Sequence, residues 1–72
     1  RDIVILNSLK NGQSGEISAI MFNEEKSKYI STLGLKIGVQ ISKKNDLIHI
    51  GDDEHLDFDA YFGNKILIRI NA

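Results

Sequence analysis

Cysteine, proline and tryptophan are all absent from this 72-residue chain. Without cysteine, disulfides, thiolate metal sites and cysteine nucleophiles are excluded, and the composition is compatible with a reducing cytosol. A basic excess is also missing, because nine Lys and Arg residues stand against ten Asp and Glu residues, a net charge of −1. Nucleic-acid-binding faces usually show such an excess, so the composition argues against nucleic acid as a partner. The lack of tryptophan argues against a groove for proline-rich peptides.

Long hydrophobic runs are missing as well. Runs such as Ile3–Leu6 and Ile66–Ile68 are far short of the roughly 20 residues that a membrane span needs, and no signal peptide is visible. The length predicts one domain over residues 1–72 that does not span a membrane. Because the first residue is Arg1, we expect either that an initiating methionine is left out or that the chain is an excised domain.

Glycine punctuates two segments, LKNGQSG at Leu9–Gly15 and LGLKIG at Leu33–Gly38. Glycine accepts positive φ without steric cost, so these positions predict turns or element ends. The four glycines assigned this structural role are Gly12, Gly15, Gly34 and Gly38.

Short apolar and alternating runs predict about five to six strands, at residues 3–6, 16–22, 39–43, 47–50, 55–59 and 65–70. One helix is predicted at about residues 24–33, with Asn23 as its N-cap, Glu24 and Glu25 in its first turn and Gly34 at its end. In the second strand, odd-numbered residues from Ile17 to Met21 are expected on one face and even-numbered ones on the other. The fold class is mainly β, a small barrel with one inserted helix. Its expected interior is Ile17, Val39, Ile41, Ile48, Ile50, Leu56, Phe58, Ile66 and Ile68.

The pairing of the fourth and fifth strands can be predicted from their apolar positions. Paired residues on antiparallel strands share a face, so Ile50 is expected opposite Leu56. Gly51 would then lie opposite His55, with 52–54 as the loop. The same register would place His49 opposite Asp57 and Leu47 opposite Asp59.

The glycine segments and the helix between them resemble the FeoA family, the small ferrous iron transport protein A. The family pattern is approximately L..L..G..G.I..I, a helix, then L..LGL..G..V.V and a terminal strand. The matching positions are Leu6, Leu9, Gly12, Gly15, Ile17, Ile20, Leu33, Gly34, Leu35, Gly38, Val39 and Ile41, with a looser match at Leu56, Phe58, Ile66 and Ile68. The resemblance covers nearly the whole chain.

This resemblance implies an SH3-like β-barrel in the bacterial cytoplasm that binds a protein partner, the FeoB-type GTPase permease for Fe²⁺. The function it implies is non-catalytic, an accessory or regulatory role in ferrous iron uptake. No serine has the context of a nucleophile elbow, which agrees with a protein that is not an enzyme. Two alternatives stay open: a transition-metal-binding sensor or carrier, and the excised C-terminal barrel of a metal-dependent transcriptional repressor.

A metal patch is the best chemical candidate among the side chains. The predicted register gathers His49, His55 and Asp57, with Asp53 or Glu54 from the loop, and makes the two histidines diagonal neighbours within about 7–8 Å. Imidazole and carboxylate ligands suit Fe²⁺, Zn²⁺ or Mn²⁺. The alternative is a solvated face of charged residues, because a metal site also needs tight geometry and supporting hydrogen bonds.

Aromatic residues give a second candidate, a partner-binding site. Tyr61 and Phe62 precede a predicted turn at Gly63-Asn64, and Tyr29 lies on the predicted helix. Exposed aromatic side chains dominate the binding energy of many protein interfaces. The alternative interpretation is that Tyr61 and Phe62 close the end of the barrel.

Overall fold

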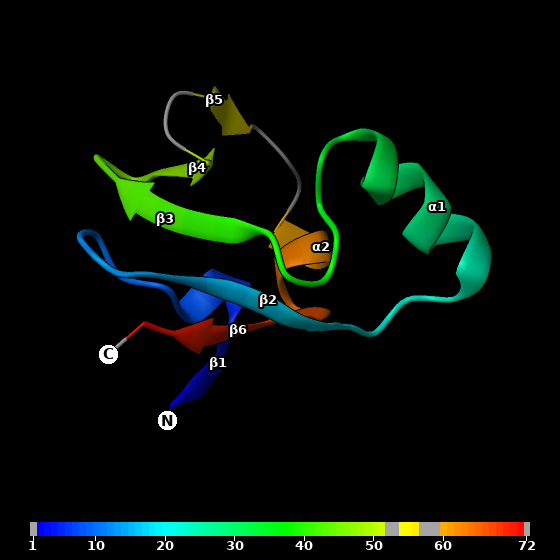
Figure 1. The fold of residues 1–72 in the computed structure, drawn as a ribbon, viewed down its shortest axis with the longest axis horizontal. Helices are drawn as coiled ribbons and strands as arrows, with labels where there is room; N and C mark the ends of the chain where they lie inside the picture. Colours follow the sequence, from blue (N-terminus) through cyan, green and yellow to red (C-terminus); the bar gives the residue numbers. More distant parts are fainter. Residues whose placement is uncertain (1, 52–53, 57–59, 72) are drawn as a thin grey trace.

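The computed structural model describes residues 2–51, 54–56 and 60–71. Six strands form one antiparallel sheet in the order β1-β6-β2-β3-β4-β5 (Figure 1). In chain order the elements are β1 (Ile3–Ile5), a 3-10 turn (Leu6–Ser8), β2 (Ser14–Ile20), α1 (Glu24–Thr32), β3 (Gln40–Lys44), β4 (Leu47–Ile50), β5 (Glu54–Leu56), α2 (Ala60–Gly63) and β6 (Ile66–Ile70). The expected mainly β fold with a helix after the second strand is confirmed. The short helix α2 stands where only a turn was predicted.

A β-bulge in β2 changes which residues of this strand face the core. Ile17 pairs with Ile68, but Ala19 pairs with Leu67, so β2 contains one more residue than β6 between these pairs. A bulge of this kind inverts the alternation of the strand beyond it. Ile17 is therefore buried on the near side of the bulge, and Ile20 packs against the core on the far side. The expectation that Met21 shares the face of Ile17 is wrong, since Met21 is 52% exposed.

Gly15 lies inside β2 and is not the turn residue that was predicted. It is paired with Ile41 of β3 and Ile70 of β6, and it is buried between them. A Cβ at this position would lie 2.7 Å from Cγ2 of Ile68 and would collide with the carbonyl oxygen of Arg69. Glycine is required here because the backbones of β2 and β6 approach too closely for any side chain. The other three predicted glycine turns are confirmed, with φ of 89° at Gly12, 94° at Gly34 and 93° at Gly38.

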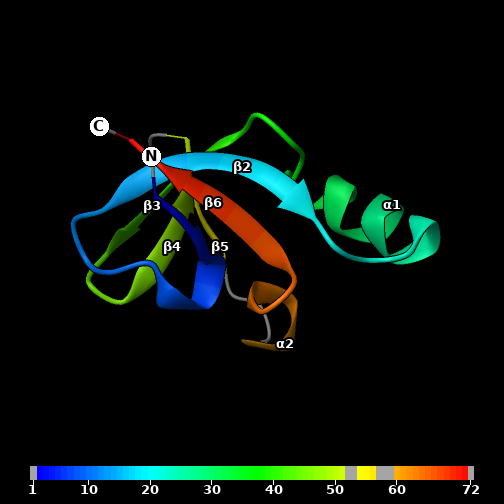
Figure 2. The ribbon, with the colours of Figure 1, turned by 90° about the horizontal axis from the view of Figure 1, so that it is seen from below.

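Helix α1 is defined at both ends by local hydrogen bonds. The Asn23 side chain accepts a hydrogen bond from the backbone N–H of Lys26 at 2.8 Å, which confirms the predicted N-cap. At the other end, Gly34 donates to the carbonyl of Ser31 and Leu35 donates to the carbonyl of Ile30. This pair of bonds, with a positive φ at the glycine, is a Schellman motif. Figures 1 and 2 both place α1 beside the sheet, beyond the end of β2.

Among the residues whose burial the structure describes, the core consists of eight side chains that are at most 1% exposed. They come from three strands (β2, β3 and β6), α1, the 3-10 turn and the loops: Leu6, Leu9, Ile17, Ile30, Leu35, Ile41, Ile66 and Ile68. Four of these were predicted as interior residues, and the predicted Val39, Ile48 and Ile50 pack against them half-buried. Leu6 and Leu9 were missed because Leu6 begins the 3-10 turn and Leu9 directly follows it, with the N–H of Leu9 donating to the carbonyl of Leu6 at 3.0 Å. Of the other predicted interior residues, Phe58 lies outside the described residues, and so does the side chain of Leu56.

The β4–β5 pairing differs from the predicted register by two residues. The structure pairs Ile48 with Leu56, His49 with His55 and Ile50 with Glu54. The predicted pairing of Ile50 with Leu56 is wrong because Gly51, at φ 67°, begins the turn directly after Ile50. A shift of two residues keeps every side chain on its own face, so alternation alone cannot distinguish the two registers. The predicted partners Asp57 and Asp59 lie outside the described residues.

Candidate functional site

Three aromatic rings meet where α1 approaches α2, and we call Phe22, Tyr29 and Phe62 the aromatic cluster. The ring centroids of Phe22 and Phe62 are 5.5 Å apart at an interplanar angle of 73°, an edge-to-face contact. Tyr29 and Phe62 are 6.5 Å apart at 37°. Such pairs are worth about 0.5–1.5 kcal/mol beyond the area they bury. The predicted partner-binding residues Tyr29 and Phe62, far apart in the sequence, are therefore side by side in the structure.

The members of the aromatic cluster differ in exposure. Phe22 and Phe62 are half-buried and pack against the hydrophobic core, so the interpretation of Phe62 as an end plug is correct in part. Tyr29 is 56% exposed and forms the outer edge of the cluster. A tyrosine held this way offers an apolar ring and a hydroxyl to a partner without first having to be ordered. Tyr61 lies in α2, and its side chain lies outside the described part of the structure.

Phe22 is the member of the cluster that sequence reasoning missed. Alternation along β2 placed it on the face opposite Ile17, and the bulge returns it to the core side. Its ring also lies under a cation, with Nζ of Lys26 at 5.9 Å from its centroid. The available signal was its position directly before the N-cap Asn23, which fixes Phe22 at the base of α1.

The two histidines occupy paired positions on neighbouring strands. His49 is half-buried in β4, and its Cα partners are Ser42 on β3 and His55 on β5. Directly paired positions are closer together than the diagonal ones that were predicted. Asp53 and Asp57 lie outside the described residues, and within the described residues no group of three or more His, Asp or Glu side chains is placed to hold a metal ion. The metal patch therefore stays a prediction.

Within residues 2–51, 54–56 and 60–71, neither helix has the length and apolar composition needed to cross a bilayer.

Comparison with known proteins identifies the fold. No family model matches the sequence, and no curated protein matches it. The bent six-stranded sheet with its helices is that of a small SH3-like β-barrel. A crystal structure of an iron uptake regulatory protein, FeoA, superposes on this chain with a TM-score of 0.87. The match covers 99% of this chain and 100% of that one, at 16% sequence identity. The likeness inferred from the glycine spacing thus extends to the fold over the full length.

Proposed function

We propose that this protein is a non-catalytic accessory module of bacterial ferrous iron uptake that acts in the cytoplasm by contact with an FeoB-type GTPase permease. The observation that supports this proposal most strongly is the fold, which matches that of an iron uptake regulatory protein over 99% of this chain and 100% of that one. The glycine pattern is a second support, because Gly12, Gly15, Gly34 and Gly38 stand at the glycine positions of the FeoA family pattern.

The aromatic cluster is the surface that we assign to this contact. Ile30 is the one buried residue of α1 and fixes the helix against the core, which presents its neighbour Tyr29 outward at a defined position. Phe62 supports the tyrosine ring from α2, and Tyr61 is the adjacent residue on the same helix. A rigid aromatic anchor loses little conformational entropy on binding, which is why such residues act as hot spots.

Binding to the permease tests the proposal. We expect the protein to bind the cytosolic part of an FeoB-type permease from the same organism saturably, measured by isothermal titration calorimetry under reducing conditions. Tyr29→Ser is expected to weaken this binding at least about tenfold, because it removes an aromatic anchor of the hot-spot kind.

Ile3→Ser is the matched control for this experiment. Ile3 is 51% exposed, close to the 56% of Tyr29, but it lies on β1. We expect Ile3→Ser to change the affinity by less than about twofold. Equal losses for the two variants would reject the aromatic cluster as the contact surface, and no binding by the unchanged protein would reject the proposed function.

A transition-metal-binding function is the second candidate, and the pairing of His49 with His55 favours it. Two imidazoles at directly paired positions can supply two ligands to Fe²⁺, Zn²⁺ or Mn²⁺, and the predicted further ligands are Asp53 and Asp57. In this role the protein would carry or sense the metal without catalysing a reaction on it.

Metal titration followed by amide NMR tests this second candidate. If it holds, micromolar Fe²⁺ or Zn²⁺ shifts the amide signals of residues 47–57 and leaves those of α1 unchanged. His49→Asn is expected to abolish the shifts, because it removes one imidazole while leaving the strand intact. A spectrum that stays silent at equimolar metal, or one that responds equally in His49→Asn, rejects the candidate.

A further inference from the structure

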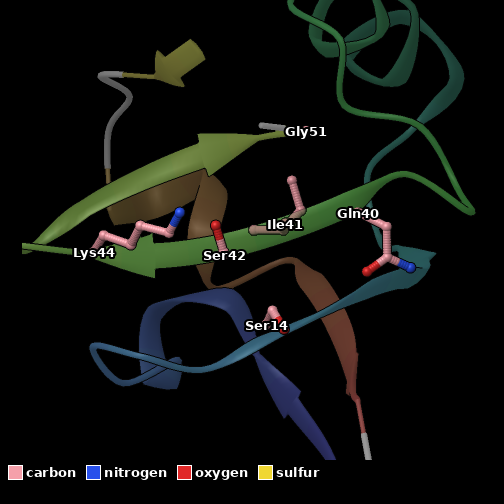
Figure 3. Close-up of a pocket in the computed structure, with 6 residues that line it drawn as sticks. All are labelled: Ser14, Gln40, Ile41, Ser42, Lys44 and Gly51. Atoms are coloured by element: carbon pink, nitrogen blue, oxygen red, sulfur yellow. The ribbon is translucent and has the colours of Figure 1, made fainter. Parts of the chain in front are cut away.

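We propose that a hollow on the polar face of β3 binds a small oxyanion, the carboxylate or phosphate group of a ligand. This inference goes beyond the proposed function and does not depend on it. The hollow measures about 270 Å³, is partly open, and is lined by Ser14, Gln40, Ile41, Ser42, Lys44 and Gly51 (Figure 3). None of these residues belongs to α1 or α2.

Strand register places the polar lining residues on one face. Gln40, Ser42 and Lys44 alternate along β3, and the residue between the first two, Ile41, is fully buried. Ser14 on β2 pairs directly with Ser42, so the two hydroxyls come from the same face of the sheet. Gly51 closes the other side, where its N–H donates to the carbonyl of Gln40 at 3.1 Å.

Hydrogen bonds from Asn71 determine which hydrogen-bonding groups of the lining residues remain available to a ligand. The side-chain N–H₂ group of Asn71 donates to Oγ of Ser14 at 3.0 Å and to Oε1 of Gln40 at 3.2 Å. These bonds use an acceptor site of the hydroxyl and the acceptor oxygen of the amide. The O–H of Ser14 and the N–H₂ of Gln40 are left as donors. With the hydroxyl of Ser42 and the ammonium of Lys44, the hollow is lined chiefly by donors.

Charge points to the same class of ligand. Two described carboxylates on neighbouring segments have other partners: Glu16 lies 3.5 Å from Arg69, and Asp46 accepts a hydrogen bond from Asn11 at 2.9 Å. Lys44 forms no ion pair with any described residue. A cation would need acceptor oxygens, and a neutral polyol would need donors and acceptors in balance. An oxyanion accepts from several donors at once and gains charge assistance from the lysine.

Titration of the isotope-labelled protein at constant ionic strength tests the proposal. We expect inorganic phosphate or N-acetylglycine to shift the amide signals of residues 14, 40, 42, 44 and 51 saturably, with a Kd of about 1 mM or tighter. Tighter binding of phosphate would assign the site to a phosphate-bearing ligand. Tighter binding of N-acetylglycine would assign it to a chain-terminal carboxylate.

Two variants and a control make the test specific. Asn71→Asp keeps the shape of the side chain but turns it into an acceptor, which draws the donors of Ser14 and Gln40 away from the hollow and adds a negative charge. It is expected to weaken binding more than about tenfold, and Lys44→Gln about fivefold. Lys36→Gln removes the same charge from the loop before β3 and should change nothing. Shifts that do not saturate, that spread over all lysines, or that persist in Asn71→Asp would overturn the proposal.

Discussion

Gly15→Ala is expected to lower the free energy of unfolding by about 3–5 kcal/mol, because the added methyl group would collide with β6. The added Cβ would lie 2.7 Å from Cγ2 of Ile68 and 2.9 Å from the backbone carbonyl carbon of Arg69. Real Cβ atoms essentially never approach other atoms so closely, and one of the two obstacles is backbone. The strain is therefore relieved only if β2 and β6 move apart.

Separation of β2 and β6 would affect the whole sheet. β6 lies between β1 and β2 in the strand order, and it contributes the buried Ile66 and Ile68. Denaturant unfolding measures the loss, as a fall in the midpoint with an unchanged slope.

Gly12→Ala is the comparison that separates crowding from backbone conformation. Gly12 has a φ of 89°, but a Cβ there would meet nothing within 4 Å. Its replacement is expected to cost about 1–2 kcal/mol from backbone strain alone. If Gly15→Ala proved no more destabilising than Gly12→Ala, the close approach of β2 and β6 would be refuted.

Ile30→Ala is expected to lower the free energy of unfolding by about 2–4 kcal/mol and to release α1 from the sheet. Ile30 is fully buried, and no other residue of this nine-residue helix is. Isolated helices of this length are marginal in water, so α1 is stable only while it is packed. The same residue lies at the start of the Schellman motif, where its backbone carbonyl accepts a hydrogen bond from the N–H of Leu35.

Hydrogen exchange shows whether the loss of stability in Ile30→Ala is concentrated in α1. In Ile30→Ala the amides of residues 27–35 should lose protection by a larger factor than those of β2 and β6. Lys28→Ala on the exposed side of α1 removes only a surface ion pair with Glu24 and should stay within about 0.5 kcal/mol of the unchanged protein. Uniform loss of protection across helix and sheet would show that α1 is not a separately anchored element.

Local signals in the sequence predicted the elements well where short-range chemistry determines them. The Asn23 cap, the Gly34 terminus and the alternation in β3 and β6 each depend on a few neighbouring residues. The bulge in β2 could not be predicted, because it arises from how β2 and β6 match over their length. The role of Gly15 was misassigned for a related reason, since a required close approach and a required positive φ both select glycine.

For the candidate sites, too, the sequence predicted what neighbouring residues determine, but not what depends on long-range packing or register. Tyr29 and Phe62 were identified as aromatic residues suited to a partner, but only the packing of α1 against α2 shows that they form one cluster with Phe22. For the histidines, the faces of β4 and β5 followed from alternation, whereas the register depended on the turn that begins at Gly51.

Contact with the permease through the aromatic cluster is the central claim. The most direct test is an amide spectrum of the labelled protein, recorded as the cytosolic part of the permease is added. The account predicts saturable changes centred on residues 22–30 and 62–64, with the outer strands β1 and β5 unaffected. Absence of any change, or saturable changes confined to β3 and β4 while the signals of Phe22, Tyr29 and Phe62 stay in place, would contradict it.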